Sequence, residues 1–104
     1  MAKVYTKEKI LEIIHPVIDP EVGFSIVDMG LVYEASMSEN GLVYIEMTLT
    51  TPACPLGPQI GQEVTTRLLE DPYITEVDFN WTFRPMWDPA TMASEEVRWA
   101  MGMF

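Results

Sequence analysis

The chain opens with hydrophobic residues that recur every three or four positions, the spacing of a helix with one buried face. Thr6 stands directly before this pattern and predicts the N-cap of the helix. Pro16 is expected to end it, because a proline ring does not fit inside a helix. Residues 15–23 then predict a turn and a loop. The pattern is carried by Ile10, Ile13, Ile14, Val17 and Ile18.

Three later segments alternate between hydrophobic and polar residues, which predicts β-strands with one buried face. They are residues 31–38, 43–50 and 77–84. Asn40-Gly41 lies between the first two segments and is typical of a hairpin turn, because both residues tolerate positive φ. The first two strands should therefore pair antiparallel, whereas the pattern alone leaves the pairing of the third strand open.

Two further helices are expected after the second strand. Hydrophobic residues four apart form one stripe over residues 56–68, and Pro55 and Pro58 suit a first helical turn. Asp71-Pro72 should stop this helix. Ser94 is placed to cap a last helix at the end of the chain.

The order of elements is therefore helix, strand, strand, helix, strand, helix, with a turn expected at Asp88-Pro89 between the third strand and the last helix. Helices must cover the hydrophobic face of a three-stranded sheet. The sequence predicts an α+β domain in two layers, with a mixed three-stranded sheet covered by helices. No linker or repeat divides it, so residues 1–104 are expected to form a single domain.

Charge restricts the class of partner. The net charge is −10, from 16 acidic and 6 basic residues, and a polyanion such as nucleic acid or an anionic membrane surface repels such a chain. The acidity is read first as a source of solubility and second as steering toward a basic protein. No hydrophobic run is long enough to span a membrane and no signal peptide is expected. A single cysteine permits no internal disulfide and favours the cytoplasm.

The most informative residue for chemistry is Cys54, between the end of a predicted strand and the start of a helix. The free N–H groups at a helix start favour a thiolate over a thiol. Thr50 and Thr51 place hydroxyl groups nearby in the sequence. Position alone leaves two interpretations open, a reactive exposed thiol and a buried inert cysteine.

A second group of polar residues lies upstream, where Asp19 and Glu21 stand in a loop with Asp28 after it. Asp-Pro followed by Gly is ordinary turn chemistry, and that is the simpler interpretation. The alternative is a pair of carboxylates near the thiol that take up protons or bind a hard metal ion. His15, the one histidine, is expected to be a helix-end residue. Residues 83–87 predict either a lid over the core or a wall beside the site.

Three motifs together carry a resemblance to a known family. They are Asp-Pro-Glu at 19–21, Ile-Val-Asp-Met-Gly-Leu-Val-Tyr at 26–33, and Met-Thr-Leu-Thr-Thr-Pro-Ala-Cys-Pro at 47–55. The chain resembles the SufT-like and PaaD-like family, which has the iron–sulfur cluster assembly domain fold. The resemblance extends from the first helix to Trp87. The Thr-Thr-Pro-x-Cys-Pro string with Asp-Pro-Glu upstream is specific, whereas either motif alone is weak.

The resemblance implies a role in maturing iron–sulfur proteins, in the manner of the SUF system, with the motif cysteine as the essential residue. It implies the assembly machinery and client apoproteins as partners. The chain departs from the family pattern at Ala53, where glycine is common, and at Met86, where proline is common. It lacks the cysteine-rich tail of the longer ring-hydroxylation relatives, so we expect the stand-alone assembly-factor branch. The implied site consists of Asp19, Glu21, Thr50, Thr51 and Cys54.

Cluster chemistry limits what one chain can hold. An iron–sulfur cluster normally takes four thiolates, and this chain offers one. We therefore expect Cys54 to contact iron or a cluster transiently, with no cofactor held stably by the monomer, although a homodimer could share one. An assembly or carrier factor is expected rather than an enzyme. Two alternatives remain, a thiol enzyme with Cys54 as nucleophile and an adaptor that recruits a basic client through its acidic surface and Trp87.

Overall fold

The three strands predicted from the alternating segments form one sheet. In a computed structural model, which describes residues 3–20, 22–50, 57–100 and 102, the sheet order is β3-β4-β5. The elements are α1 (Lys7–Ile14), β1 (Ile18–Asp19), β2 (Phe24–Ser25), β3 (Val32–Met37), β4 (Leu42–Met47), α2 (Gly57–Leu69), β5 (Glu76–Trp81), α3 (Pro89–Met92) and α4 (Glu95–Ala100).

The sheet is mixed, as predicted. Strands β3 and β4 are antiparallel, with Ala35 opposite Ile45, whereas β4 and β5 are parallel, with Ile45 opposite Phe79. Parallel neighbours need a long crossover connection, and helix α2 lies within it. This arrangement makes β4 the central strand, so the chain leaves the middle of the sheet where β4 ends.

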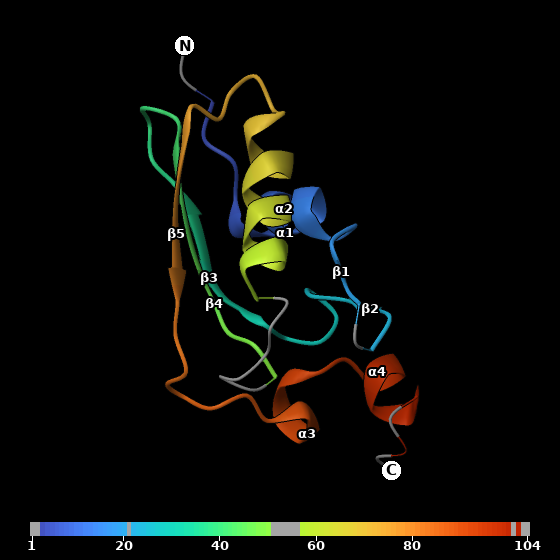
Figure 1. Cartoon of the computed structure of the whole chain (residues 1–104). Coiled ribbons are helices and arrows are strands. Elements are labelled where there is room, and N and C mark those ends of the chain that lie inside the picture. The colour runs from blue at the N-terminus through green and yellow to red at the C-terminus, as the bar shows by residue number, and fades with distance from the viewer. Residues whose placement is uncertain (1–2, 21, 51–56, 101, 103–104) are drawn as a thin grey trace.

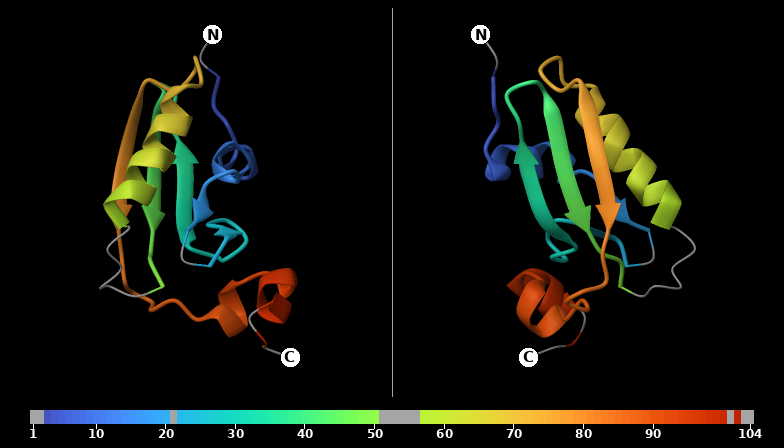
Figure 2. Two further views of the ribbon diagram at one scale, coloured as in Figure 1. Left: turned by 45° about the vertical axis from the view of Figure 1, so that its right-hand side comes forward. Right: turned by 90° about the vertical axis from the view of Figure 1, so that its left-hand side faces the viewer.

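Helices α1 and α2 cover one face of the sheet (Figures 1 and 2). Helix α2 lies close to β5, since a Cβ added at Gly61 would meet the Phe79 ring at 3.3 Å. Burial of these side chains is the main driving force for the two-layer fold. The core between the layers includes the fully buried Ile10, Ile14, Val43, Ile45, Met47, Val64 and Leu68.

The opposite face of the sheet is left uncovered by the described elements (Figure 2). Glu34 and Glu46 stand directly opposite each other in the β3–β4 pair, and Asp78 lies on the neighbouring strand beside Tyr44. Like charges that face each other across strands are unfavourable unless water solvates them. The alternation seen in the sequence therefore separates a hydrophobic core from a hydrated acidic face.

The predicted helix caps are confirmed. The Thr6 hydroxyl accepts a hydrogen bond from the Lys9 N–H at 3.2 Å, and the Ser94 hydroxyl accepts one from the Val97 N–H at 3.3 Å. Helix α1 ends at Ile14, two residues before Pro16. Each cap satisfies an N–H that a helix start would otherwise leave without a partner.

Several details of the prediction were wrong, including the end of the second strand, which is Met47 rather than residue 50. The segment predicted as a loop, residues 15–23, contains strand β1, which pairs with β2 directly after it, with Asp19 opposite Phe24. The predicted turn at Asp88-Pro89 begins the short helix α3, because the Asp88 carboxylate caps it at Ala90. The third strand ends at Trp81 rather than at residue 84. The Thr82 N–H still donates to the Met47 carbonyl of β4 at 2.9 Å, and beyond it the Thr82 hydroxyl makes local hydrogen bonds with the Arg84 backbone, which turn the chain away from the sheet.

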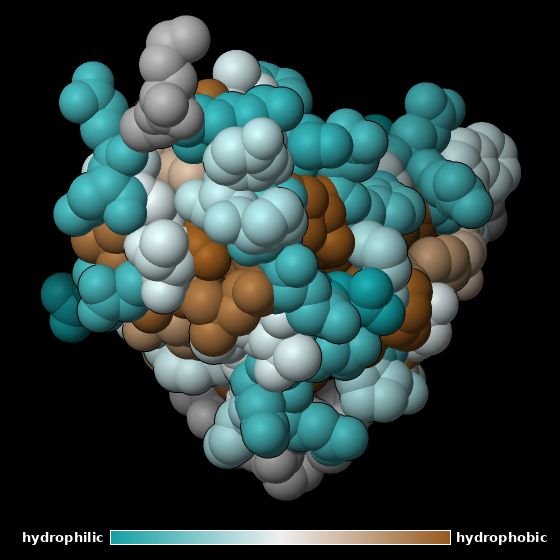
Figure 3. All heavy atoms as spheres, turned by 90° about the horizontal axis from the view of Figure 1, so that it is seen from above, coloured by the Kyte–Doolittle hydropathy of each residue, from teal (hydrophilic) through white to brown (hydrophobic). Residues whose placement is uncertain are grey.

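The segment after β5 folds back over one end of the sheet, where α3 and α4 lie (Figure 1). The Ser94 N–H donates to the Asp28 carbonyl at 2.7 Å, which joins α4 to the motif at 26–33. Seen from the opposite end, the surface is mostly hydrophilic, with separate hydrophobic patches (Figure 3). Among the described residues, none of the helices has the length and hydrophobicity needed to cross a membrane.

Candidate functional site

The site residues implied by the motifs fall partly within the described structure. Asp19 lies in β1 and is 1% exposed, and its carbonyl accepts a hydrogen bond from the Gly23 N–H at 2.8 Å. Thr50 is half-buried and follows the end of β4. Glu21, Thr51 and Cys54 lie outside the described residues, so the exposure of the thiol stays a prediction.

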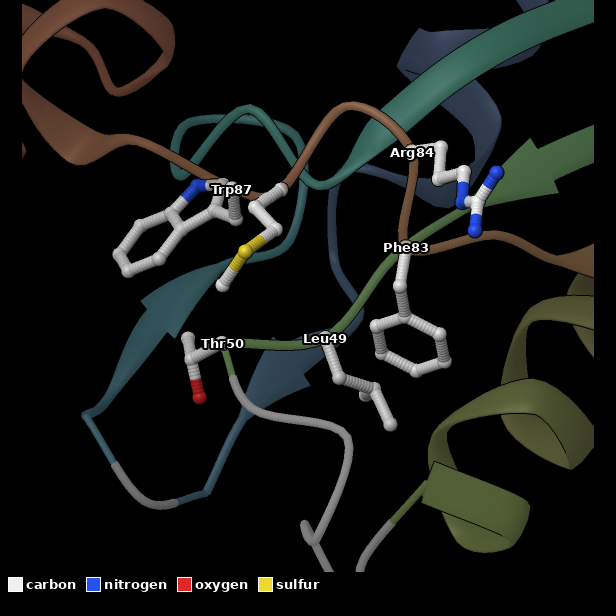
Figure 4. A pocket seen from close by; sticks show the side chains of 6 residues that line it. Leu49, Thr50, Phe83, Arg84 and Trp87 are labelled. Carbon is white, nitrogen blue, oxygen red and sulfur yellow. The ribbon is translucent and has the colours of Figure 1, made fainter.

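The β1–β2 hairpin and the end of β4 occupy the same end of the molecule (Figures 1 and 2). A close view shows Thr50 beside this hairpin (Figure 4). The topology thus brings Asp19 and Thr50, which are far apart in the sequence, to one end of the sheet. Residues at the carboxyl ends of strands in such crossovers are common positions for binding sites.

A pocket of about 310 Å³ lies at this end, lined by Leu49, Thr50, Phe83, Arg84, Met86 and Trp87. Its walls come from two segments, the continuation of β4 and the chain after β5 (Figure 4). Most of the lining is hydrophobic, and Thr50 and Arg84 supply the polar groups. A mostly hydrophobic cavity with a few polar groups is the usual form of a binding site.

Hydrogen bonds hold the wall that follows β5. The Trp87 indole Nε1–H donates to the Met29 carbonyl at 2.7 Å, and the Tyr33 hydroxyl donates to the Pro85 carbonyl at 2.9 Å. Burial raises the pKa of the Tyr33 hydroxyl, which keeps it a donor at neutral pH. The Met29 carbonyl and the Tyr33 hydroxyl, which both belong to the motif at 26–33, therefore position residues 85–87.

Gly30 allows the C-terminal segment to approach the motif closely. Its φ of +75° is in the left-handed region, and a Cβ there would lie 2.1 Å from the Met92 carbonyl oxygen. Only glycine meets both conditions without strain. The Met-Gly pair of the motif is explained by this packing, since one residue accepts from Trp87 and the other makes room for α3.

His15 and Asp28 form a pair that the sequence did not connect. The His15 Nε2 lies 3.2 Å from both Asp28 carboxylate oxygens, and both side chains are partly exposed. His15 caps the carboxyl end of α1, as a helix-end residue was expected to do. Asp28 is therefore engaged with His15, which makes it a poor candidate for a base acting on the thiol.

The described residues form no cluster of side chains that could hold a metal ion. Nowhere in residues 3–20, 22–50, 57–100 and 102 do three or more His, Asp or Glu side chains gather as metal ligands would. The one cysteine lies outside these ranges. Any ligand set that includes Cys54 stays a prediction.

The sequence predicts residues 83–87 to be a lid over the core or a wall beside the site, and in the structure they contribute to the core and to a pocket. Phe83 and Trp87 pack against the core while they also line the pocket. The part that the sequence prediction missed is Leu49, which belongs to a predicted strand and gives no local signal of a pocket. Only the folding of two distant segments onto one end of the sheet brings Leu49 beside residues 83–87.

Comparison with known proteins places the chain in a family. Residues 7–80 match the family described as iron–sulfur cluster assembly protein. The chain is 41% identical over 87 residues to the Fe-S protein maturation auxiliary factor SufT of Staphylococcus aureus, covering 84% of this chain and 98% of that protein. It is 42% identical over 81 residues to the corresponding factor YitW of Bacillus subtilis, covering 78% and 79%.

Solved structures agree with the sequence comparison. A conserved hypothetical protein from Thermotoga maritima superimposes with a TM-score of 0.85 at 35% identity, covering 99% of this chain and 100% of that chain. A domain of unknown function from Bacillus anthracis gives a TM-score of 0.85 at 34% identity, covering 94% and 92%. The predicted family and α+β fold are thereby confirmed. The chain belongs to the iron–sulfur cluster assembly protein family.

Proposed function

We propose that this chain is an accessory factor that helps to assemble iron–sulfur clusters or to transfer them to client proteins, acting through the thiol of Cys54. The main support is its 41% identity to a maturation auxiliary factor, of which it spans 98%. The Thr-Thr-Pro-Ala-Cys-Pro string at 50–55 supplies the one thiol of the chain. A thiolate is the protein ligand that iron–sulfur clusters use.

The described geometry supports a site for a macromolecular partner at this end of the sheet. The pocket at Thr50 is mostly hydrophobic and open to solvent at Met86, which is 75% exposed. Cys54 follows Thr50 by four residues in the sequence. A client bound at the pocket would therefore contact Thr50, a residue close to the thiol along the chain.

The contact with cluster or iron is proposed to be transient. A complete shell needs about four thiolates, and this chain contributes one. The remaining ligands would come from the donor, the client or a second copy of this chain. Such a shared shell suits a carrier, because a cargo held by one protein ligand is released easily. We place this activity in the cytoplasm, within a SUF-type system.

The proposal predicts that Cys54→Ser abolishes function without unfolding the protein. In a bacterial strain lacking its own copy of the gene, wild-type chain should restore the activity of an iron–sulfur enzyme such as aconitase. Cys54→Ser should leave that activity at the level of the empty strain, because a serine hydroxyl is not a thiolate ligand. Ser36→Ala, on the uncovered face of β3, is the control.

Equal protein levels and far-ultraviolet circular dichroism spectra must accompany this comparison. Full restoration by Cys54→Ser would contradict the thiol mechanism and favour an adaptor that works through its surface alone. A partial loss shared by Ser36→Ala would indicate a stability effect instead of a chemical one.

Transient binding makes a separate prediction for the purified protein. After anaerobic reconstitution with iron and sulfide, the visible absorption of a cluster should disappear on gel filtration of the monomer, because one thiolate cannot retain it. Cys54→Ser should behave the same way after filtration and bind less before it. A stoichiometric cluster that survives filtration on a monomer would overturn the transient contact.

A further inference from the structure

We propose that the pocket binds a large hydrophobic side chain of a client polypeptide and that Arg84 pairs with a carboxylate next to that side chain. The inference rests on the proposed function for the identity of the partner as a client protein. It adds what the client must present, a hydrophobic residue with an acidic neighbour in an extended segment. The hydrophobic lining of the pocket is the reason to expect a hydrophobic residue, and the positive charge of Arg84 is the reason to expect an acidic neighbour.

Among the described residues, Arg84 is the one basic residue that lines the pocket. Acidic residues outnumber basic ones by 16 to 6 in the chain, and the charged pairs in its described part use Lys9, Arg67 and His15. Within that part, the exposed Arg84 guanidinium forms no ion pair. An arginine beside the pocket that forms no ion pair is available for a carboxylate from outside, and its planar fork binds a carboxylate through two hydrogen bonds.

The structure holds Arg84 at the rim of the pocket. The Arg84 N–H donates to the Thr82 hydroxyl at 3.3 Å, and the Tyr33 hydroxyl binds the carbonyl of the next residue, Pro85. Figure 4 shows the Arg84 side chain turning away from Phe83, toward the outside of the pocket. A group bound by Arg84 therefore lies outside the cavity, while its neighbour along the client chain enters it.

The size and lining of the pocket suit one large side chain. Its volume of about 310 Å³ is near the lower limit for ligand cavities. The aromatic rings of Phe83 and Trp87 favour an aromatic guest, whose ring gains from edge and face contacts. Met86 is flexible and 75% exposed, so it can adapt to guests of different shape. Successive residues of an extended segment point in opposite directions, which separates the hydrophobic group from the acidic one.

The test uses short peptides with blocked ends in which the central pair is Phe-Glu, Phe-Gln, Phe-Lys or Ala-Glu. Binding is followed by nuclear magnetic resonance on the indole N–H signal of Trp87, assigned with a Trp87→Phe sample. The Phe-Glu peptide should shift this signal saturably, and the Phe-Gln and Ala-Glu peptides should bind about fivefold or more weakly. Arg84→Gln should bind Phe-Glu and Phe-Gln equally. Arg67→Gln, which removes the same charge far from the pocket, should behave as the wild type.

Equal binding of Phe-Glu and Phe-Gln by the wild type would overturn the role of Arg84. Stronger binding of Phe-Lys would show that the acidic surface selects the partner, which also contradicts the proposal. A shift absent for all four peptides would exclude the pocket as a side-chain site. These outcomes are independent of the Cys54→Ser result, because loss of function in that variant together with no peptide binding would leave the proposed function standing and remove only this inference.

Discussion

Gly30→Ala is expected to lower the free energy of unfolding by about 3–5 kcal/mol. The backbone at Gly30 has a φ of +75°, which costs a residue with a Cβ about 1–2 kcal/mol. The new Cβ would also lie 2.1 Å from the Met92 carbonyl oxygen, a backbone atom that moves only if α3 moves. Urea denaturation followed by circular dichroism measures the loss.

Gly23→Ala separates the two causes. Gly23 has a similar φ of +78°, but a Cβ there would meet nothing within 4 Å. It should therefore cost only the backbone term of about 1–2 kcal/mol. Equal losses in the two variants would contradict the close packing of α3 against the motif. A larger loss in Gly30→Ala, together with a changed tryptophan emission spectrum, would show that the pocket wall shifts with α3.

Ile45→Ala should also cost about 2–5 kcal/mol, because it empties part of the core beneath the helices. Ile45 is fully buried on the central strand β4, between Ala35 and Phe79 of the two neighbouring strands. A domain of this size has a total stability of about 5–15 kcal/mol, so the variant should denature at a clearly lower temperature. Thermal unfolding by circular dichroism measures the change.

Ile18→Ala is the matched control, since the same atoms are removed from a side chain that is 44% exposed in β1. It should cost about 1 kcal/mol or less, the usual effect of a surface substitution. Similar losses at the two positions would contradict the two-layer core described above. The comparison needs no assumption about the functional site, because neither residue lines the pocket.

Local patterns predicted most of the fold because the elements are set by contacts within short segments. The alternation in 43–50 indicated a strand, and the structure buries its residues Val43, Ile45 and Met47. Thr6 and Ser94 indicated the starts of two helices, because their hydroxyl groups cap the first turn. The β1–β2 hairpin was not predicted because its strands have two residues each, too few to show an alternation of hydrophobic and polar residues. The parallel pairing of β5 depends on where α2 packs, which no single segment encodes.

The candidate site was predictable only in part, for a related reason. The motifs indicated Asp19 and Thr50 by resemblance, and the described residues place both at one end of the sheet (Figures 1 and 4). The pocket depends on hydrogen bonds between groups about 50 residues apart or more, such as Trp87 with Met29 and Tyr33 with Pro85. The sequence predicted Arg84 both as a polar position at the end of a strand and as part of the wall at 83–87, and the structure ends β5 at Trp81.

The two walls of the pocket belong to distant parts of the chain, and this has a consequence for biosynthesis. A ribosome makes the Leu49–Thr50 wall and the cysteine well before it makes Phe83–Trp87. A nascent chain halted between these points contains Cys54 but lacks the second wall of the pocket. On the proposal that clients bind at this pocket, such an unfinished chain would not yet compete with finished ones for clients.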